Sequence, residues 1–214
     1  MTEIYVVPTD GSGARLLVTA RPGDPPRVAG EARGPSWSPQ GDEIAYTAHG
    51  EVRAVRADGT GTPRVITRDL GTPTWAPDGR RLALTGGRPD WRYDSIYVVN
   101  ADGSGLRRLT KHAYLGGFAW SPDGRRILYG MENRLGIYVY VIGADGRSNR
   151  RVTADARAQI AWGAMTWSRD RRSIAYTTDR TGRGDLYVID ANGRNELRLT
   201  RSGRTDLAPS WAPR

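Results

Sequence analysis

His49 and His112 are the only histidines of this chain, and histidine is the residue type most often found at catalytic and metal sites. They lie in different parts of the sequence, without the spacing of a zinc motif. The chain has no Gly-x-Ser-x-Gly turn, the motif that presents a nucleophilic serine. It has no cysteine either, so thiol chemistry is excluded. We therefore expect no enzymatic activity, no cofactor and no metal; a cation site using Asp94 or Asp179 is the alternative.

Recognition of a partner is better supported, because polar and aromatic residues gather in irregular segments. These segments are residues 21–34, 86–94, 111–117, 130–135, 154–164 and 178–185. Variable loops on a rigid scaffold often carry binding residues. The predicted partner-binding residues are Asp90, Trp91, Tyr93, Asp94, His112, Tyr114, Glu132, Trp162, Asp179 and Arg180. The competing interpretation is that they serve solubility and local turn packing.

The segments between these loops repeat. A tryptophan recurs every 38 to 47 residues, at Trp37, Trp75, Trp120, Trp167 and Trp211. Periods of about 40 to 50 residues are typical of propeller blades. One large side chain per module is expected to fill the space between neighbouring blades rather than to bind a ligand.

Each repeat is predicted to be four strands, A to D. Residues 117–129 place two apolar runs on either side of a Pro-Asp-Gly turn, which is typical of a hairpin. A third run, residues 96–99, leads through Ala-Asp-Gly-Ser-Gly into a fourth at 106–110. We expect one all-β domain over residues 1–214, built as a β-propeller of four-stranded antiparallel blades. Four blades are complete, and a composite blade from the two chain ends would close a five-bladed ring.

The chain is strongly basic, with a net charge of +9 over 214 residues, and Lys111 is its only lysine. Arginine bias of this kind is typical either of a surface for acidic partners or nucleic acid, or of a solvated surface. Because the arginines are dispersed through every repeat, we favour the solvated surface and expect no nucleic-acid partner. No run of about 20 apolar residues is present, so we expect no membrane insertion.

The repeated residues resemble the TolB-type propeller repeat. The resemblance rests on Trp-Ser-Pro-Asp-Gly at 120–124, related segments at 37–41 and 75–79, and Ala-Asp-Gly-Ser-Gly at 101–105. It covers nearly the whole chain and implies a fold without fixing a function, because similar repeats occur in periplasmic protein-binding TolB, in propeller domains of prolyl oligopeptidase-like enzymes and in some polysaccharide lyases. The TolB-type ring has six blades, so an open or oligomer-completed fragment of a six-bladed ring is the alternative architecture.

One repeat departs from the pattern, since Trp167-Ser168-Arg169-Asp170-Arg171 lacks both the proline and the glycine. This turn is expected either to adopt another geometry or to carry about 1 kcal/mol of strain.

The leading functional hypothesis is a non-catalytic scaffold that binds a protein or peptide through irregular loops at one end of the ring. The alternatives are a propeller hydrolase or lyase acting on peptides or sugars, and a self-assembling structural module. The chain would be a monomer or a strand-completing homo-oligomer. It is expected to be cytoplasmic as encoded, and periplasmic or extracellular if its N-terminus is truncated.

Overall fold

The computed structural model describes residues 2–20, 33–87, 94–111, 117–133, 136–154, 160–180, 184–201, 206 and 209–211. Within these residues every regular element is a β-strand. The strands are β1 (Thr2–Val6), β2 (Arg15–Ala20), β3 (Arg33–Trp37), β4 (Glu43–Ala48), β5 (Glu51–Arg56), β6 (Arg64–Arg68), β7 (Gly71–Trp75), β8 (Arg81–Gly87), β9 (Asp94–Asn100), β10 (Arg107–Arg108), β11 (Phe118–Trp120), β12 (Arg126–Asn133), β13 (Gly136–Gly143), β14 (Arg150–Arg151), β15 (Ile160–Trp167), β16 (Ser173–Thr178), β17 (Asp185–Asp190) and β18 (Leu197–Arg198).

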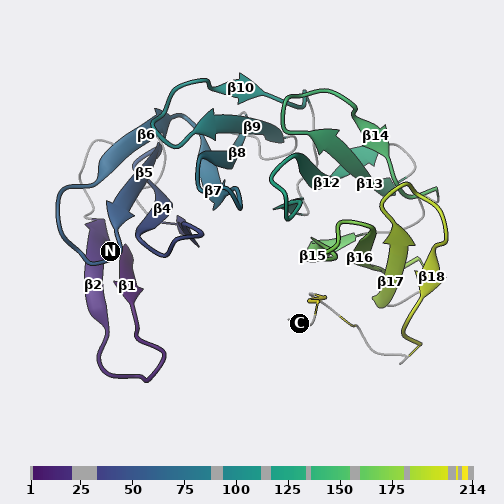
Figure 1. Cartoon of the computed structure of the whole chain (residues 1–214), viewed down its shortest axis with the longest axis horizontal. Helices are drawn as coiled ribbons and strands as arrows, with labels where there is room; N and C mark the ends of the chain where they lie inside the picture. The colour runs from purple at the N-terminus through teal and green to yellow at the C-terminus, as the bar shows by residue number, and fades with distance from the viewer. Residues whose placement is uncertain are drawn as a thin grey trace. The chain divides into compact units, whose positions relative to one another are not determined.

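The strands form four four-stranded sheets and one two-stranded sheet, β1–β2. In each four-stranded sheet, consecutive strands pair side by side and antiparallel, as can be followed for β15 to β18 in Figure 1. The predicted all-β fold and four-stranded blades are therefore confirmed. Ring closure and the number of blades stay predictions.

The chain forms two compact units. The first comprises Met1–Gly87 with Ile96–Arg108, and the second comprises Arg88–Ser95 with Leu109–Arg214. Sheets β1–β2, β3–β6 and β7–β10 thus fall essentially in the first unit, and β11–β14 and β15–β18 in the second. A single domain over residues 1–214 stays a prediction.

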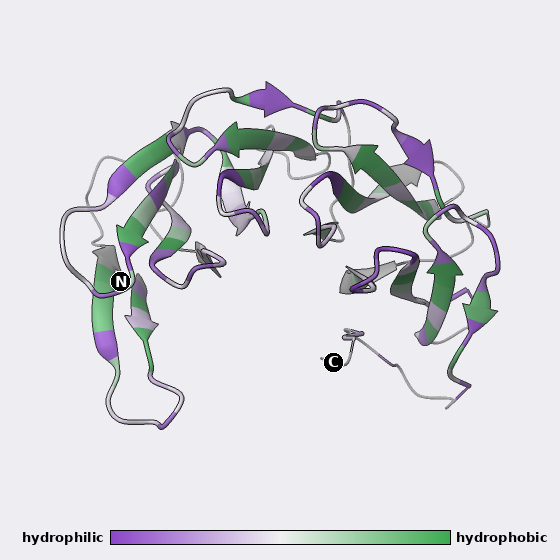
Figure 2. Cartoon of the chain, in the orientation of Figure 1, coloured by the Kyte–Doolittle hydropathy of each residue, from purple (hydrophilic) through white to green (hydrophobic). Residues whose placement is uncertain are grey.

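The second strand of each full sheet is buried on both faces. In β4, Ile44 and Tyr46 pack toward β1–β2, whereas Ala45 joins a cluster that includes Leu82 and Leu84 of the next sheet. Bulky residues therefore lie on one face of this strand and a small residue on the other, between stacked sheets. The outer strands are more polar, and β10 and β14, two arginines each, stand out as hydrophilic in Figure 2.

The tryptophans of the repeat do not all have the same environment. Trp75 is buried in a cluster with Val52 and Ile66 of the preceding sheet. Trp167 is buried in the same way against the sheet β11–β14, and Trp120 is also buried. Trp37, in contrast, is 50% exposed.

The exposure of Trp37 follows from the strand content of the first sheet. A tryptophan of strand A packs against the preceding sheet, as Trp75 does. The sheet that precedes Trp37 contains only β1 and β2, which correspond by sequence to strands C and D. Among the described residues, this sheet has no first or second strand for Trp37 to pack against. Near the other end of the chain, residues 209–211 are not in a strand and Trp211 is 36% exposed.

Candidate partner-binding surfaces

One end of each sheet is closed by a hydrogen-bonded turn of repeated design. In the turn between β11 and β12, Ser121 Oγ donates to Asp123 Oδ1 at 2.6 Å and accepts from the amide of Arg126 at 2.9 Å. Asp123 Oδ1 also accepts from the amide of Arg125 at 3.1 Å. Gly124 completes the turn with φ 65°, a left-handed conformation that glycine adopts without strain. The Ser-Pro-Asp-Gly motif therefore specifies its own geometry.

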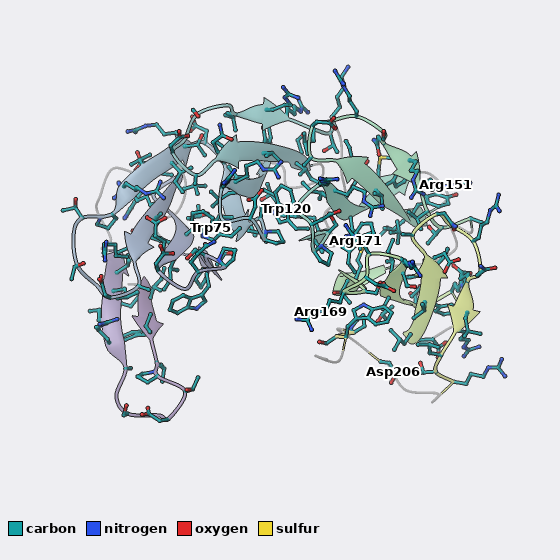
Figure 3. The ribbon with its side chains drawn as sticks, in the orientation of Figure 1. Trp75, Trp120, Arg151, Arg169, Arg171 and Asp206 are labelled. Atoms are coloured by element: carbon teal, nitrogen blue, oxygen red, sulfur yellow. The ribbon has the colours of Figure 1, made fainter. Side chains whose placement is uncertain are left out.

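The exceptional turn between β15 and β16 keeps this geometry. Ser168 Oγ donates to Asp170 Oδ1 at 2.6 Å, as its counterpart does, and Arg171 occupies the glycine position with φ 65°. The sequence predicted either another turn geometry or backbone strain, and the structure shows the same geometry with the strain at Arg171. Arg171 Nη1 also lies 3.1 Å from Asp123 Oδ2, so the guanidinium links the turns of two neighbouring sheets. Figure 3 labels Arg171 and Arg169 on this turn.

We predict that Arg171→Gly is about 1 kcal/mol more stable than Arg171→Ala, since both lose the ion pair but only glycine relieves the left-handed strain. The measurement is urea unfolding. Arg125 is the control, because its φ is not positive. There the order should reverse, with alanine more stable than glycine, and the same order at both sites would contradict the strain argument.

The carboxyl group of Asp123 is held in its charged form. Burial alone would raise its pKa, but hydrogen bonds from Ser121, the Arg125 amide and Arg171 outweigh burial and lower the pKa to about 2 from 3.8. A depressed folded-state pKa stabilises the fold above the unfolded-state pKa, and this stabilisation is lost as the pH falls through the folded value.

We expect Asp123→Asn to lower the free energy of unfolding by roughly 2 kcal/mol at pH 7, because each pKa unit corresponds to about 1.4 kcal/mol. The difference from wild type should shrink between about pH 4 and pH 2, where the native carboxylate also becomes protonated. Denaturant unfolding at several pH values measures this. A difference that does not change with pH would show that the charge of Asp123 contributes nothing.

Arginines of the fourth strands tie neighbouring sheets together, a role that the sequence did not reveal. The side chain of Arg15 donates to the carbonyl oxygen of Ala57, Arg64 to that of Ala101, and Arg150 to that of Ala191. In each pair the acceptor lies in the turn after the third strand of the next sheet. The interval of 37 to 42 residues between donor and acceptor is close to one repeat. Part of the arginine content is therefore structural.

The opposite end of the sheets carries the irregular connections, where the partner-binding residues were predicted. Asp90, Trp91, Tyr93, His112 and Tyr114 lie outside the described residues. For Asp94 in β9, Glu132 in β12 and Trp162 in β15, the structure describes the strand but not the side chain. Asp179 is partly buried at the end of β16. The assignment of these residues to partner binding stays a prediction.

Arg180 is the predicted binding residue whose contacts are best described. Its guanidinium pairs with Glu196 at 2.6 Å and lies 3.9 Å from the centre of the Tyr187 ring. Glu196 also accepts a hydrogen bond from the hydroxyl of Tyr176. Burial, reinforced by Glu196, raises the pKa of Tyr176. These contacts give Arg180 a role in holding β16, β17 and the following turn together.

Acidic residues begin the third strands of two sheets and are neutralised by arginines. Glu51 at the start of β5 pairs with Arg53 and Arg68, each at 2.5 Å. Asp185 at the start of β17 is 2% exposed and pairs with Arg198 at 2.8 Å. In β9 the corresponding residue is Ser95, which is also buried, and Asp94 lies one residue before it. The alternative cation site at Asp94 stays a prediction.

Within the described residues, no cluster of three or more histidine, aspartate or glutamate side chains could hold a metal ion. A search of the same residues finds no helix with the length and apolar character needed to cross a membrane.

Comparison with known proteins gives consistent matches over the whole chain. The family model described as "TolB beta propeller domain" matches residues 3–156 and 112–214. The Tol-Pal system protein TolB of Anaeromyxobacter dehalogenans is 32% identical over 128 residues, which are 51% of this chain and 28% of that protein. The chain therefore spans only part of the length of the curated relative.

Solved structures extend the similarity of fold. The putative TolB from Agrobacterium tumefaciens superposes with a TM-score of 0.71 at 20% identity, covering 97% of this chain and 72% of that one. A puromycin-hydrolysing peptidase of Mycobacterium tuberculosis superposes with a TM-score of 0.65 at 17% identity, covering 83% of this chain and 32% of that one. At these identities the likeness concerns the fold alone.

Proposed function

The chain belongs to the TolB beta-propeller domain family, and we propose that it is a non-catalytic scaffold that binds a protein or peptide through the irregular loops at one end of its sheets. The observation that carries the proposal is the contrast between the two ends. At one end, repeated serine and aspartate side chains are used up in closing tight turns. At the other, the connections differ in length and sequence from repeat to repeat.

The scaffold itself supports this assignment. Buried second strands, inter-sheet tryptophans and arginine ties hold neighbouring sheets of each unit together. Such a framework can present loops of varied sequence without changing its own structure. The curated relative is named as a protein of the Tol-Pal system, and this name favours a protein partner for this chain too.

A loop-exchange experiment tests the proposal. The order of residues 88–93 and 112–116 is scrambled within each segment, so that composition and charge are unchanged and the strands β8 and β9 are left intact. Partners captured by the wild-type chain and identified by mass spectrometry should be lost, while the circular dichroism spectrum and melting temperature are retained. The matched control exchanges Thr9 and Ser12 for alanine at the turn end. Retention of every partner by a folded loop variant would reject the proposal.

An enzymatic role remains the competing function, since some chains with this fold are peptidases by title. Hydrolysis of peptide or oligosaccharide substrates by the isolated chain, with or without divalent cations, would overturn the non-catalytic assignment.

We also propose that the sheets close into a five-bladed ring in a monomer. The first sheet leaves one edge of β1 without a strand partner among the described residues. An exposed strand edge invites pairing with another chain. A monomeric mass by light scattering supports closure within one chain, and a concentration-independent dimer would favour completion by a second copy.

A further inference from the structure

The turns after the third strands differ between the two units at one position. In the first unit, the residue after the turn glycine is Ser12, Thr60 or Ser104, and its hydroxyl donates to the turn aspartate at 2.6 to 2.7 Å. In the second unit, the same position holds Arg147 and Arg194. These two turns therefore lack the hydrogen bond from a hydroxyl group and carry an arginine side chain in its place.

The turns between first and second strands show the same difference. In the second unit, Arg125 follows Gly124 and Arg172 follows Arg171, whereas the first unit has Asp42 and Arg80 at these positions. Arg169 further replaces the turn proline. We call Arg125, Arg147, Arg169, Arg172 and Arg194 the turn arginines. All five are exposed, and the described part of the chain offers their guanidinium groups no hydrogen bond or ion pair.

The turn arginines share one surface of the second unit. Antiparallel pairing places both turns of a sheet at the same end. The two sheets are aligned at that end, because Arg171 reaches Asp123 and Arg150 reaches the carbonyl of Ala191. The carboxylates on this surface are engaged by the turns themselves: Asp145 and Asp170 accept from backbone amides at 2.9 and 3.0 Å. These carboxylates keep their negative charge, but the five turn arginines outnumber them, so the turn end presents mainly cations.

A general arginine bias does not account for this surface. The first unit is also rich in arginine but carries one arginine at its five matched positions, Ser12, Asp42, Thr60, Arg80 and Ser104, whereas all four in the second unit are arginine. Arg171 also has a left-handed backbone conformation, at the position where the other turns between first and second strands have a glycine. Strained non-glycine residues persist where another requirement outweighs their conformational cost.

We propose that the turn arginines form a docking surface for an acidic polypeptide segment, distinct from the irregular loops of the proposed function. The planar guanidinium donates two parallel hydrogen bonds to a carboxylate. Asp123, Asp145 and Asp170 lie in the same turns as these cations, which suits discrete carboxylates better than a continuous phosphate backbone. No aromatic residue lies in these turns, so the stacking used by single-stranded nucleic-acid sites is lacking.

The test compares two variants of equal charge. In the turn variant, Arg125, Arg147, Arg172 and Arg194 become serine, and in the control variant Arg80, Arg107, Arg108 and Arg201, also exposed, become serine. The probe is a fluorescein-labelled deca-glutamate peptide, followed by anisotropy. The turn variant should bind at least about tenfold more weakly than wild type, and the control less than about threefold, because attraction from net charge alone falls equally in both.

The proposal is overturned if the peptide does not bind to wild type, or if both variants weaken its binding equally. It is also overturned if a deca-thymidine oligonucleotide binds to wild type more tightly than the peptide does and if only the turn variant loses this binding. If the turn variant does not fold, Arg147→Ser with Arg194→Ser replaces it, since serine is the residue that the first unit uses there. That double variant should still weaken peptide binding by about threefold or more. Unchanged binding to a folded double variant would also count against the surface.

Discussion

Replacing Trp75 with alanine is expected to lower the free energy of unfolding by about 3 to 5 kcal/mol, whereas the same change at Trp37 should lower it by about 1 kcal/mol or less. Both residues end the first strand of a sheet and precede the same type of turn. Trp75 is 6% exposed between two sheets, and its removal leaves a cavity that backbone strands cannot fill by small shifts. Trp37 is half exposed, so its removal leaves no comparable cavity.

Urea unfolding of the two variants measures the difference directly. Trp75→Phe is a useful intermediate, because it keeps an aromatic ring and removes a buried indole N–H that has no hydrogen-bond acceptor among the described residues. It should lose less than half of what Trp75→Ala loses. Equal losses at positions 37 and 75 would show that Trp37 is covered in solution, either by another part of the chain or by a second copy.

The turns were the most predictable part of this fold. Proline, aspartate and glycine each have a local conformational role, so Ser121 to Gly124 specify a turn without help from the rest of the molecule. The strands on either side follow from the alternation seen in Ile44, Ala45 and Tyr46, since that pattern needs a sheet buried on both faces. Local rules therefore led to the four-stranded sheets.

What the sequence could not supply depends on neighbours that are remote along the chain. The exposure of Trp37 depends on a preceding sheet that has only two strands among the described residues, and the contact of Arg64 with Ala101 needs two sheets in register. Arg171 keeps the turn geometry because the hydrogen bonds of Ser168 and Asp170 outweigh the preference of one residue. The ion pair of Arg180 with Glu196 was likewise hidden, since a charged loop residue gives no sign of its partner.

The arginines illustrate how one residue type serves several purposes. Arg64 and Arg150 cross between sheets, Arg68 and Arg198 neutralise acids at the start of third strands, and the turn arginines face solvent. Composition treats all of them as the same bias. Only their positions in the repeat distinguish structural cations from those that are available to a partner.

Gly103→Ala is expected to lower the free energy of unfolding by about 2 to 4 kcal/mol, and Gly11→Ala by about 1 kcal/mol. Both glycines follow an aspartate in the turn after a third strand and have positive φ, 88° and 75°. Alanine is strained at either position. At Gly103, however, the new Cβ would lie 2.6 Å from the carbonyl oxygen of Ile66 in the preceding sheet, whereas at Gly11 no atom of the described residues lies within 4 Å.

The comparison isolates the close approach of two sheets from the turn conformation. Gly193 repeats the arrangement in the second unit, with its Cβ position 2.8 Å from the carbonyl oxygen of Val152 and φ 87°. Gly193→Ala should therefore match Gly103→Ala rather than Gly11→Ala when thermal and urea unfolding are measured. If all three variants lost the same stability, conformational strain would account for the glycine, and the sheets would not need to pack this closely. The larger loss at two of the three sites would instead make glycine in this turn a requirement of stacking one sheet on the next.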